Sequence, residues 1–275
     1  MYKPKREKFS ILVNSRFVVF ISLFAVFFGL AFSGISAPAL ATDSVRTPDP
    51  TPTAIGDPIG AVGSPTDSVR FNPLQYSIDK ANSPWVVVNK QRPLSNLKYV
   101  PALASPPFKF PGTHNPYGAV LTKDAGAAIV KLAKAMADEK AGTMVISSGY
   151  RSYSLQVSVH SRQVARFGLK AGEALAARPG YSEHQTGLAA DVYALGQECK
   201  IYTCFANTKA GKWLAVNAPR FGFIVRYQQG QSATTGYQFE PWHLRYVGTS
   251  LATEYTRVKA TSLEQFFNLP KAPTY

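Results

Sequence analysis

Apolar residues recur at helical spacing in several stretches of the chain. The clearest stripe spans residues 128–136, with Thr122 as a good N-cap before it and Gly142 to end the helix after it. Further helices are expected at 154–167, at 171–177, at 209–217, and after Ser262, where Ser-Leu-Glu-Gln forms a capping-box pattern.

Short runs of β-branched and other apolar residues lie between these helices. They predict buried strands at 144–146, 187–193, 221–227 and 242–247. The helices and strands do not alternate in a regular βαβ order. We therefore expect an α+β fold, in which helices flank a small and mainly antiparallel sheet.

The first 83 residues have a different pattern from the rest. Residues 3–8 are basic, 17–32 are almost entirely apolar, and 37–41 are mostly small, which predicts a secretory signal cleaved after Ala41. The same apolar run could also remain as a membrane anchor. Residues 42–83 are rich in Pro, Thr and Ser and predict a disordered linker, so the folded domain is expected at 84–275.

The formal net charge of +14 fits polyanionic surroundings such as nucleic acid, anionic lipid or an anionic cell wall. The export signal makes nucleic acid a poor candidate. We expect an extracytoplasmic protein at an anionic bacterial cell envelope, either secreted or anchored, that contacts the membrane only through its N-terminal segment.

The two cysteines, Cys199 and Cys204, lie close together in the sequence. Metal binding and redox chemistry are open to such a pair, but an oxidising compartment favours a local disulfide. Closing so short a loop contributes about 2 kcal/mol in the chain-entropy model. The expected effect of the disulfide is to stiffen the loop.

Acidic residues accompany two of the four histidines. His184 lies seven residues before Asp191, and a loop that runs into a strand can bring side chains at that spacing together. His243 follows Glu240 by three residues. Two imidazole nitrogens and one carboxylate leave a fourth position of tetrahedral zinc open, with Glu240 as a base beside it. Arg151, after a predicted strand, could face a developing oxyanion. Purely structural roles fit the same residues.

A longer motif links these residues to a known family. Ser182-x-His184-x-x-Gly187-x-Ala189-x-Asp191, followed by Glu240-x-Trp242-His243, resembles the signature of the zinc D-alanyl-D-alanine carboxypeptidases of the VanY type. The wider grouping includes D-Ala-D-Ala dipeptidases, penicillin-insensitive murein endopeptidases and the hedgehog signalling domain. The resemblance covers about residues 85–269.

The resemblance implies a role for each residue of the motif. It implies a Zn²⁺ site in a cleft on the sheet, with His184, Asp191 and His243 as ligands, Glu240 as the catalytic base and Arg151 stabilising the transition state. It also implies that Ser182 and Gln156 grip the terminal residue of the substrate. Tyr150 and Trp242 are further candidates for binding substrate, although packing in the core explains both equally well.

The expected function is removal of the terminal D-alanine from peptidoglycan stem peptides that end in D-Ala-D-Ala, by metal-activated water. The same zinc site would also serve a peptidoglycan endopeptidase or a D-Ala-D-Ala dipeptidase, and export argues against the dipeptidase. A non-catalytic wall-binding module that contains zinc is the alternative from another class. The presence of Glu240 argues against it, because a structural zinc site needs no base.

Overall fold

The computed structural model describes residues 71–104 and 119–275. The signal or anchor expected at 1–41 and most of the linker expected at 42–83 lie outside these residues. Among the residues that are described, no helix has the length and apolar character needed to cross a membrane.

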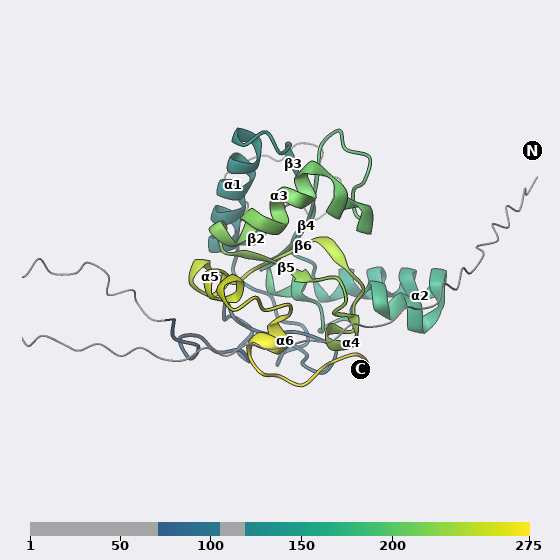
Figure 1. Ribbon diagram of the computed structural model, residues 1–275. Coiled ribbons are helices and arrows are strands. Elements are labelled where there is room, and N and C mark those ends of the chain that lie inside the picture. Colours follow the sequence, from purple (N-terminus) through teal and green to yellow (C-terminus); the bar gives the residue numbers. More distant parts are fainter. Residues whose placement is uncertain (1–70, 105–118) are drawn as a thin grey trace, which may run out of the picture. The chain divides into compact units, whose positions relative to one another are not determined.

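Helices and strands are mixed along the described chain (Figure 1). The strands are β1 (Leu103–Ala104), β2 (Leu121–Thr122), β3 (Met144–Ser148), β4 (Ala189–Ala194), β5 (Phe223–Tyr227) and β6 (Glu240–Tyr246). The α-helices are α1 (Lys123–Asp138), α2 (Tyr153–Leu175), α3 (Lys209–Asn217), α4 (Ser232–Thr235), α5 (Thr249–Arg257) and α6 (Leu263–Phe266). Three short 3₁₀ helices complete the set: η1 (Glu183–Thr186), η2 (Thr203–Asn207) and η3 (Ala218–Phe221).

Four strands form the main sheet, in the order β3-β4-β6-β5, and every neighbouring pair is antiparallel. β1 and β2 form a separate two-stranded ribbon. The expected α+β fold with a small antiparallel sheet is confirmed. The two central strands, β4 and β6, pair Asp191 directly with His243.

One face of the sheet is apolar and packs on α1 and α3 (Figure 1). Because side chains alternate between the two faces of a strand, every second residue of β4 and β6 points into this layer. The buried contacts of this core include Ala190, Val192 and Leu244 from the sheet, Ile129, Leu132 and Met136 from α1, and Leu214 from α3.

The opposite face of the sheet is polar at its centre. Asp191, His243 and Arg245 share this face because they alternate with the apolar set, and Ile224 on β5 lies opposite Arg245. Ile224 belongs to a second apolar cluster, which includes Trp85 and residues of α5 and α6. The sheet therefore holds charged groups between two apolar layers, which is the position of the candidate site.

Two helical regions differ from the expectation. The helices expected at 154–167 and 171–177 form one kinked element, α2, in which Gly168 has the positive φ of 78° that only glycine adopts readily. The sequence did not predict α5. This helix buries Leu251, Ala252 and Tyr255 on one narrow stripe within nine residues, too short a run for periodicity to identify.

The folded part of the chain begins before residue 84. Phe71 stacks on Trp85 with ring centroids 5.5 Å apart, and the amide of Val87 donates a hydrogen bond to the carbonyl of Ile78 (2.9 Å). Residues 71–83 therefore pack on the domain, although the sequence assigned them to the linker. Their apolar residues are too widely spaced to form a helical or strand pattern.

Replacing Phe71 by alanine tests this boundary. We expect the free energy of unfolding to fall by about 1–3 kcal/mol, because a half-buried aromatic ring leaves its contact with Trp85. Leu74→Ala is the matched control, since Leu74 is 87% exposed, and it should change stability by less than about 0.5 kcal/mol. If urea denaturation gave the same change in the free energy of unfolding for both substitutions, residues 71–83 would belong to the linker.

Candidate active site

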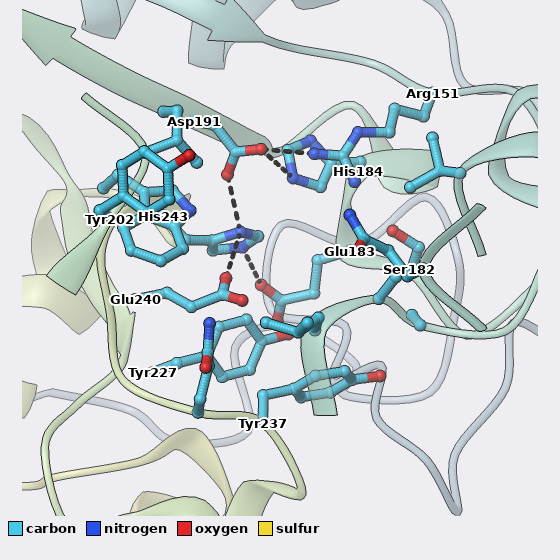
Figure 2. Close-up of a pocket in the computed structure, with 18 of the residues that line it drawn as sticks. Arg151, Ser182, Glu183, His184, Asp191, Tyr202, Tyr227, Tyr237, Glu240 and His243 are labelled. Carbon is cyan, nitrogen blue, oxygen red and sulfur yellow. Dashed lines mark hydrogen bonds and ion pairs between the residues drawn. The ribbon is translucent and has the colours of Figure 1, made fainter. Parts of the chain in front are cut away.

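The structure brings His184, Asp191 and His243 together at the polar face of the sheet (Figure 2). His184 Nε2 lies 3.3 Å from Asp191 Oδ2, and His243 Nδ1 lies 3.2 Å from Asp191 Oδ1. One ligand atom from each residue falls within 4.8 Å of the other two, and all three side chains are buried. Three residues that are far apart in sequence thus present their donor atoms to one point.

The backbone explains this convergence. η1 ends at Gly187, whose left-handed backbone (φ 70°) turns the chain into β4 two residues before Asp191. Asp191 then lies directly opposite His243 in the β4–β6 ladder, so that both side chains point to the same face. The turn places His184 beside them.

The other nitrogen of each imidazole has a fixed partner. His184 Nδ1 donates to the carbonyl oxygen of Gly149 (2.7 Å), and His243 Nε2 lies 3.2 Å from Glu183 Oε2. These partners hold a proton on the outer nitrogen of each ring and leave the inner nitrogen as an electron-pair donor, the usual arrangement of histidines that bind a metal.

The donor set fits a divalent cation. Asp191 Oδ1 is buried and accepts no hydrogen bond within the part of the chain that is described, which leaves a lone pair without a partner. The three donor atoms all lie within 4.8 Å of one another, close enough to converge on one ion. His184, Asp191 and His243 would hold such an ion and leave its fourth position open toward the cleft.

Burial and charge set the protonation of the two imidazoles differently. Burial, with a contribution from Arg151, lowers the pKa of His184 to about 4, so this ring is neutral at pH 7. Burial also acts to lower the pKa of His243, but the carboxylates of Asp191 and Glu183 outweigh it and raise that pKa to about 9. A cation that binds His243 must therefore displace a proton.

Glu183 lies behind the cluster and is fully buried. Its Oε1 accepts hydrogen bonds from Arg226 Nε (2.8 Å) and Arg245 Nη1 (2.8 Å). Arg226 in turn forms a two-point ion pair with Glu264 (2.7 and 2.9 Å). Burial acts to raise the pKa of Glu183, but the two guanidinium groups and His243 lower it below the ordinary value. We call these four residues the buried ion network.

The buried ion network has two positive and two negative charges, and further partners satisfy its ends. Asn89 donates to Glu264 Oε1 (3.0 Å), and Arg245 Nη2 donates to the carbonyls of Pro84 (3.0 Å) and Val86 (2.7 Å). Sequence reasoning missed Glu183 and Arg245. The only sequence signal was a carboxylate next to His184, and its burial could not be read from the motif.

Glu240 opens β6 and is buried beside the histidines, with its Oε2 3.7 Å from His243 Nδ1. An irregularity in the β5–β6 pairing precedes the Tyr227–Glu240 pair, and such bulges redirect side chains. Burial is the largest influence on Glu240 and raises its pKa to about 8, against the opposing charges of His243 and Arg151. A carboxyl group with this pKa can take and return a proton near neutral pH.

Arg151 follows the end of β3 and lines the same cleft. Its Nε donates to Ser148 Oγ (2.8 Å), its Nη2 forms an ion pair with Asp191, and its backbone amide donates to the carbonyl of His184 (3.1 Å). Because Nη1 makes no hydrogen bond among the described residues, a donor remains for an oxygen atom in the cleft.

The cluster lies in a cleft of about 580 Å³. Ser182 and Trp242 line the cleft, and Trp242 also packs in the main core. Gln156 is fully buried on α2, where its Nε2 donates to the carbonyl of Ala177 (2.8 Å), and neither Gln156 nor Tyr150 is among the lining residues. The role of these four residues in binding substrate stays a prediction.

Cys199 and Cys204 form the expected disulfide. The residues between them, Lys200 to Thr203, all line the cleft. Sequence reasoning predicted the pairing but did not place this loop at the site.

Comparison with known proteins agrees with the fold and the site. The sequence model of the VanY D-alanyl-D-alanine carboxypeptidase family matches residues 118–249. The carboxypeptidase homologue YodJ of Bacillus subtilis (strain 168) is 34% identical over 211 residues. The match covers 74% of this chain and 76% of YodJ. The chain belongs to the VanY-type carboxypeptidase family.

Two solved structures extend this comparison. The LD-carboxypeptidase LdcB superposes with a TM-score of 0.63 at 33% identity, covering 70% of this chain and 88% of LdcB. A variant of the D,D-pentapeptidase VanY from a VanB-type resistance cassette, in complex with Zn(II), has a TM-score of 0.56 at 30% identity, covering 66% of this chain and 98% of VanY. The protein is thus an enzyme of the peptidase type.

Replacing Glu183 by glutamine tests whether its contact with His243 contributes to metal affinity. We expect the affinity for a divalent cation to fall about 10–100-fold, because His243 loses the carboxylate that orients its ring. The free energy of unfolding should also fall, by about 3 kcal/mol, since two buried guanidinium groups lose a counter-charge. Zinc titration against a competing chelator measures the first effect, and urea denaturation the second.

Glu264→Gln is the matched control. Glu264 belongs to the same buried ion network but does not contact His243. The substitution Glu264→Gln should lower the free energy of unfolding about as much as Glu183→Gln does, while changing the metal affinity by less than about threefold. Equal loss of metal affinity in the two variants would show that Glu183 acts only through stability.

Proposed function

We propose that this protein is an exported, zinc-dependent carboxypeptidase that removes the terminal D-alanine from peptidoglycan stem peptides. The observation that carries the proposal is the meeting of three metal-donor atoms with Glu240 and Arg151 in one cleft. Membership of the VanY-type family supports the peptidase class, and the zinc in the related VanY structure supports the choice of metal.

Each residue then has a defined task. A zinc ion held by the three ligands would supply a Lewis acid for the substrate carbonyl and would lower the pKa of a water molecule to about 7. Glu240 removes the proton from the attacking water and returns it to the leaving amine. The guanidinium group of Arg151 donates hydrogen bonds to the oxygen on which negative charge develops.

A relative supports the terminal D-alanine as leaving group. A structure of VanYB in complex with D-alanine-D-alanine has a TM-score of 0.56 to this chain at 29% identity. The cleft of the present chain has Ser182, the expected contact for the terminal residue, next to Glu183 and the metal ligand His184.

The second candidate is an L,D-carboxypeptidase, which would cut D-alanine from a tetrapeptide stem. LdcB is an LD-carboxypeptidase, and DacB of Streptococcus pneumoniae, which is 37% identical with a TM-score of 0.53, is an L,D-carboxypeptidase. The same zinc site would serve both reactions. They differ in the substrate residue that precedes the cleaved bond, so the preference of the cleft for that residue decides between them.

The substitution Glu240→Ala tests whether the site is catalytic. We expect metal content, measured by plasma mass spectrometry, to stay at one ion per chain while turnover falls at least about 10²–10⁴-fold, because the proton acceptor is lost. The exposed Glu139 offers the control Glu139→Ala, which should keep full activity. A Glu240→Ala protein with undiminished turnover would rule out this mechanism, and a chelator that strips the metal without slowing the wild type would do the same.

The products identify the bond that is cut. The purified protein is incubated separately with stem pentapeptide, stem tetrapeptide, free D-Ala-D-Ala and cross-linked muropeptides, and the products are weighed by mass spectrometry. Loss of one alanine from the pentapeptide alone supports the D,D-carboxypeptidase, and loss from the tetrapeptide supports the L,D-carboxypeptidase. Cleavage restricted to cross-links or to the free dipeptide would replace both with an endopeptidase or a dipeptidase.

Export is supported by the basic and apolar N-terminal pattern and by the disulfide, which forms readily in oxidising compartments. N-terminal sequencing of the protein recovered from its bacterial host should give a chain that begins at Thr42. An N-terminus at residue 1 in the membrane fraction would identify a retained anchor. Recovery of the intact chain from the cytoplasm alone would contradict export.

A further inference from the structure

The disulfide loop forms one wall of the cleft. Its four internal residues, Lys200, Ile201, Tyr202 and Thr203, all line the same cavity as the metal-donor cluster, and Tyr202 is among the side chains drawn around that cavity in Figure 2. Cys199 and Cys204 are five positions apart, and every residue between them thus contributes to the wall of this cleft.

The loop is held at its base and open at its tip. Phe205 is fully buried in the main core, Cys199 and Ile201 pack against that core, and the amide of Phe205 donates to the carbonyl of Tyr202 (2.9 Å). The residue Tyr202 nevertheless stays 71% exposed. Its position is fixed by the disulfide and the base contacts rather than by burial of the ring, so a flat aromatic surface remains available to a ligand.

The charges of the cleft are separated by depth. Its acidic lining residues, Glu183, Asp191 and Glu240, are buried around the metal-donor cluster. Lys200 from the disulfide loop and Arg166 from α2 also line the cleft, and both are exposed. A peptide that carries carboxylates away from its cleaved end would meet these cations.

We propose that the loop between Cys199 and Cys204 is a substrate-binding subsite for the part of an anionic peptide that precedes the cleaved bond. Tyr202 provides the packing surface, and Lys200 pairs with a side carboxylate. The disulfide orders the loop before the substrate arrives, which lowers the entropic cost of binding. This inference rests on the proposed function for the nature of the substrate and adds a site that selects long, acidic stems over short ones.

Two peptides test the subsite by calorimetry. One is the stem pentapeptide L-Ala-γ-D-Glu-L-Lys-D-Ala-D-Ala, and the other is its last three residues, which lack the glutamate carboxylate. Binding is measured on zinc-loaded protein with Glu240→Ala, so that turnover does not interfere. We expect the pentapeptide to bind about tenfold more tightly than the tripeptide, a difference of about 1.4 kcal/mol.

Substitutions in the loop should remove this preference. Tyr202→Ala should weaken the pentapeptide about tenfold, and the double variant Cys199→Ser, Cys204→Ser about threefold, with little change for the tripeptide. Lys200→Gln should weaken binding of the pentapeptide about threefold. It should also abolish the difference in affinity between the pentapeptide and the same peptide with its glutamate carboxylate converted to a carboxamide. Leu195→Ala and Lys212→Gln are the matched controls, because both residues are exposed and neither lines the cleft.

The outcomes separate the subsite from the proposed function. Equal affinity of the wild-type loop for the two peptides, or equal weakening of both by Tyr202→Ala, would overturn the subsite. If Tyr202→Ala weakens binding of the pentapeptide but not of the tripeptide, the result supports the subsite, whichever bond the enzyme cuts. Failure of the protein to hydrolyse any stem peptide would instead refute the proposed function, and the binding measurements would still decide the role of the loop.

Discussion

The contact between Glu183 and His243 is the interaction on which the site depends. It orients the imidazole and fixes its tautomer, and it connects the metal-donor cluster to the buried ion network. Taking four charges out of water is costly unless each is paired and hydrogen-bonded, and here every charged group has such partners. The position of His243 is thereby set by a network whose members lie on η1, β5, β6 and α6.

The rest of the cleft is arranged around this fixed centre. The apolar layer under α1 and α3 keeps the sheet rigid, and the direct pairing of Asp191 with His243 transfers that rigidity to the ligands. Glu240 and Arg151 each lie close to an irregular point of the sheet, near the start of β6 and near the end of β3. Regular pairing thus holds the metal-donor cluster, while local irregularity directs the two groups proposed to move protons and to stabilise charge.

The sequence predicted the motif residues and the antiparallel sheet, because both depend on local patterns. The spacing of His184 and Asp191 and the periodicity of 128–136 are properties of short segments. Glu183 and Arg245 were missed because their role depends on partners 43 to 62 residues away. Residues 71–83 were placed in the linker because Phe71 packs through isolated ring contacts with Trp85 and Phe266, which leave no periodic signal.

The reach of the buried ion network has a consequence for how the protein matures. Asn89 and Glu264 are 175 residues apart and meet in the same network, so a chain in which α6 has not yet docked leaves Arg226 without its two-point partner. Contacts of such long range form slowly during folding. Assembly of the metal-donor cluster is therefore coupled to completion of the whole domain, and a partly folded chain lacks the assembled site.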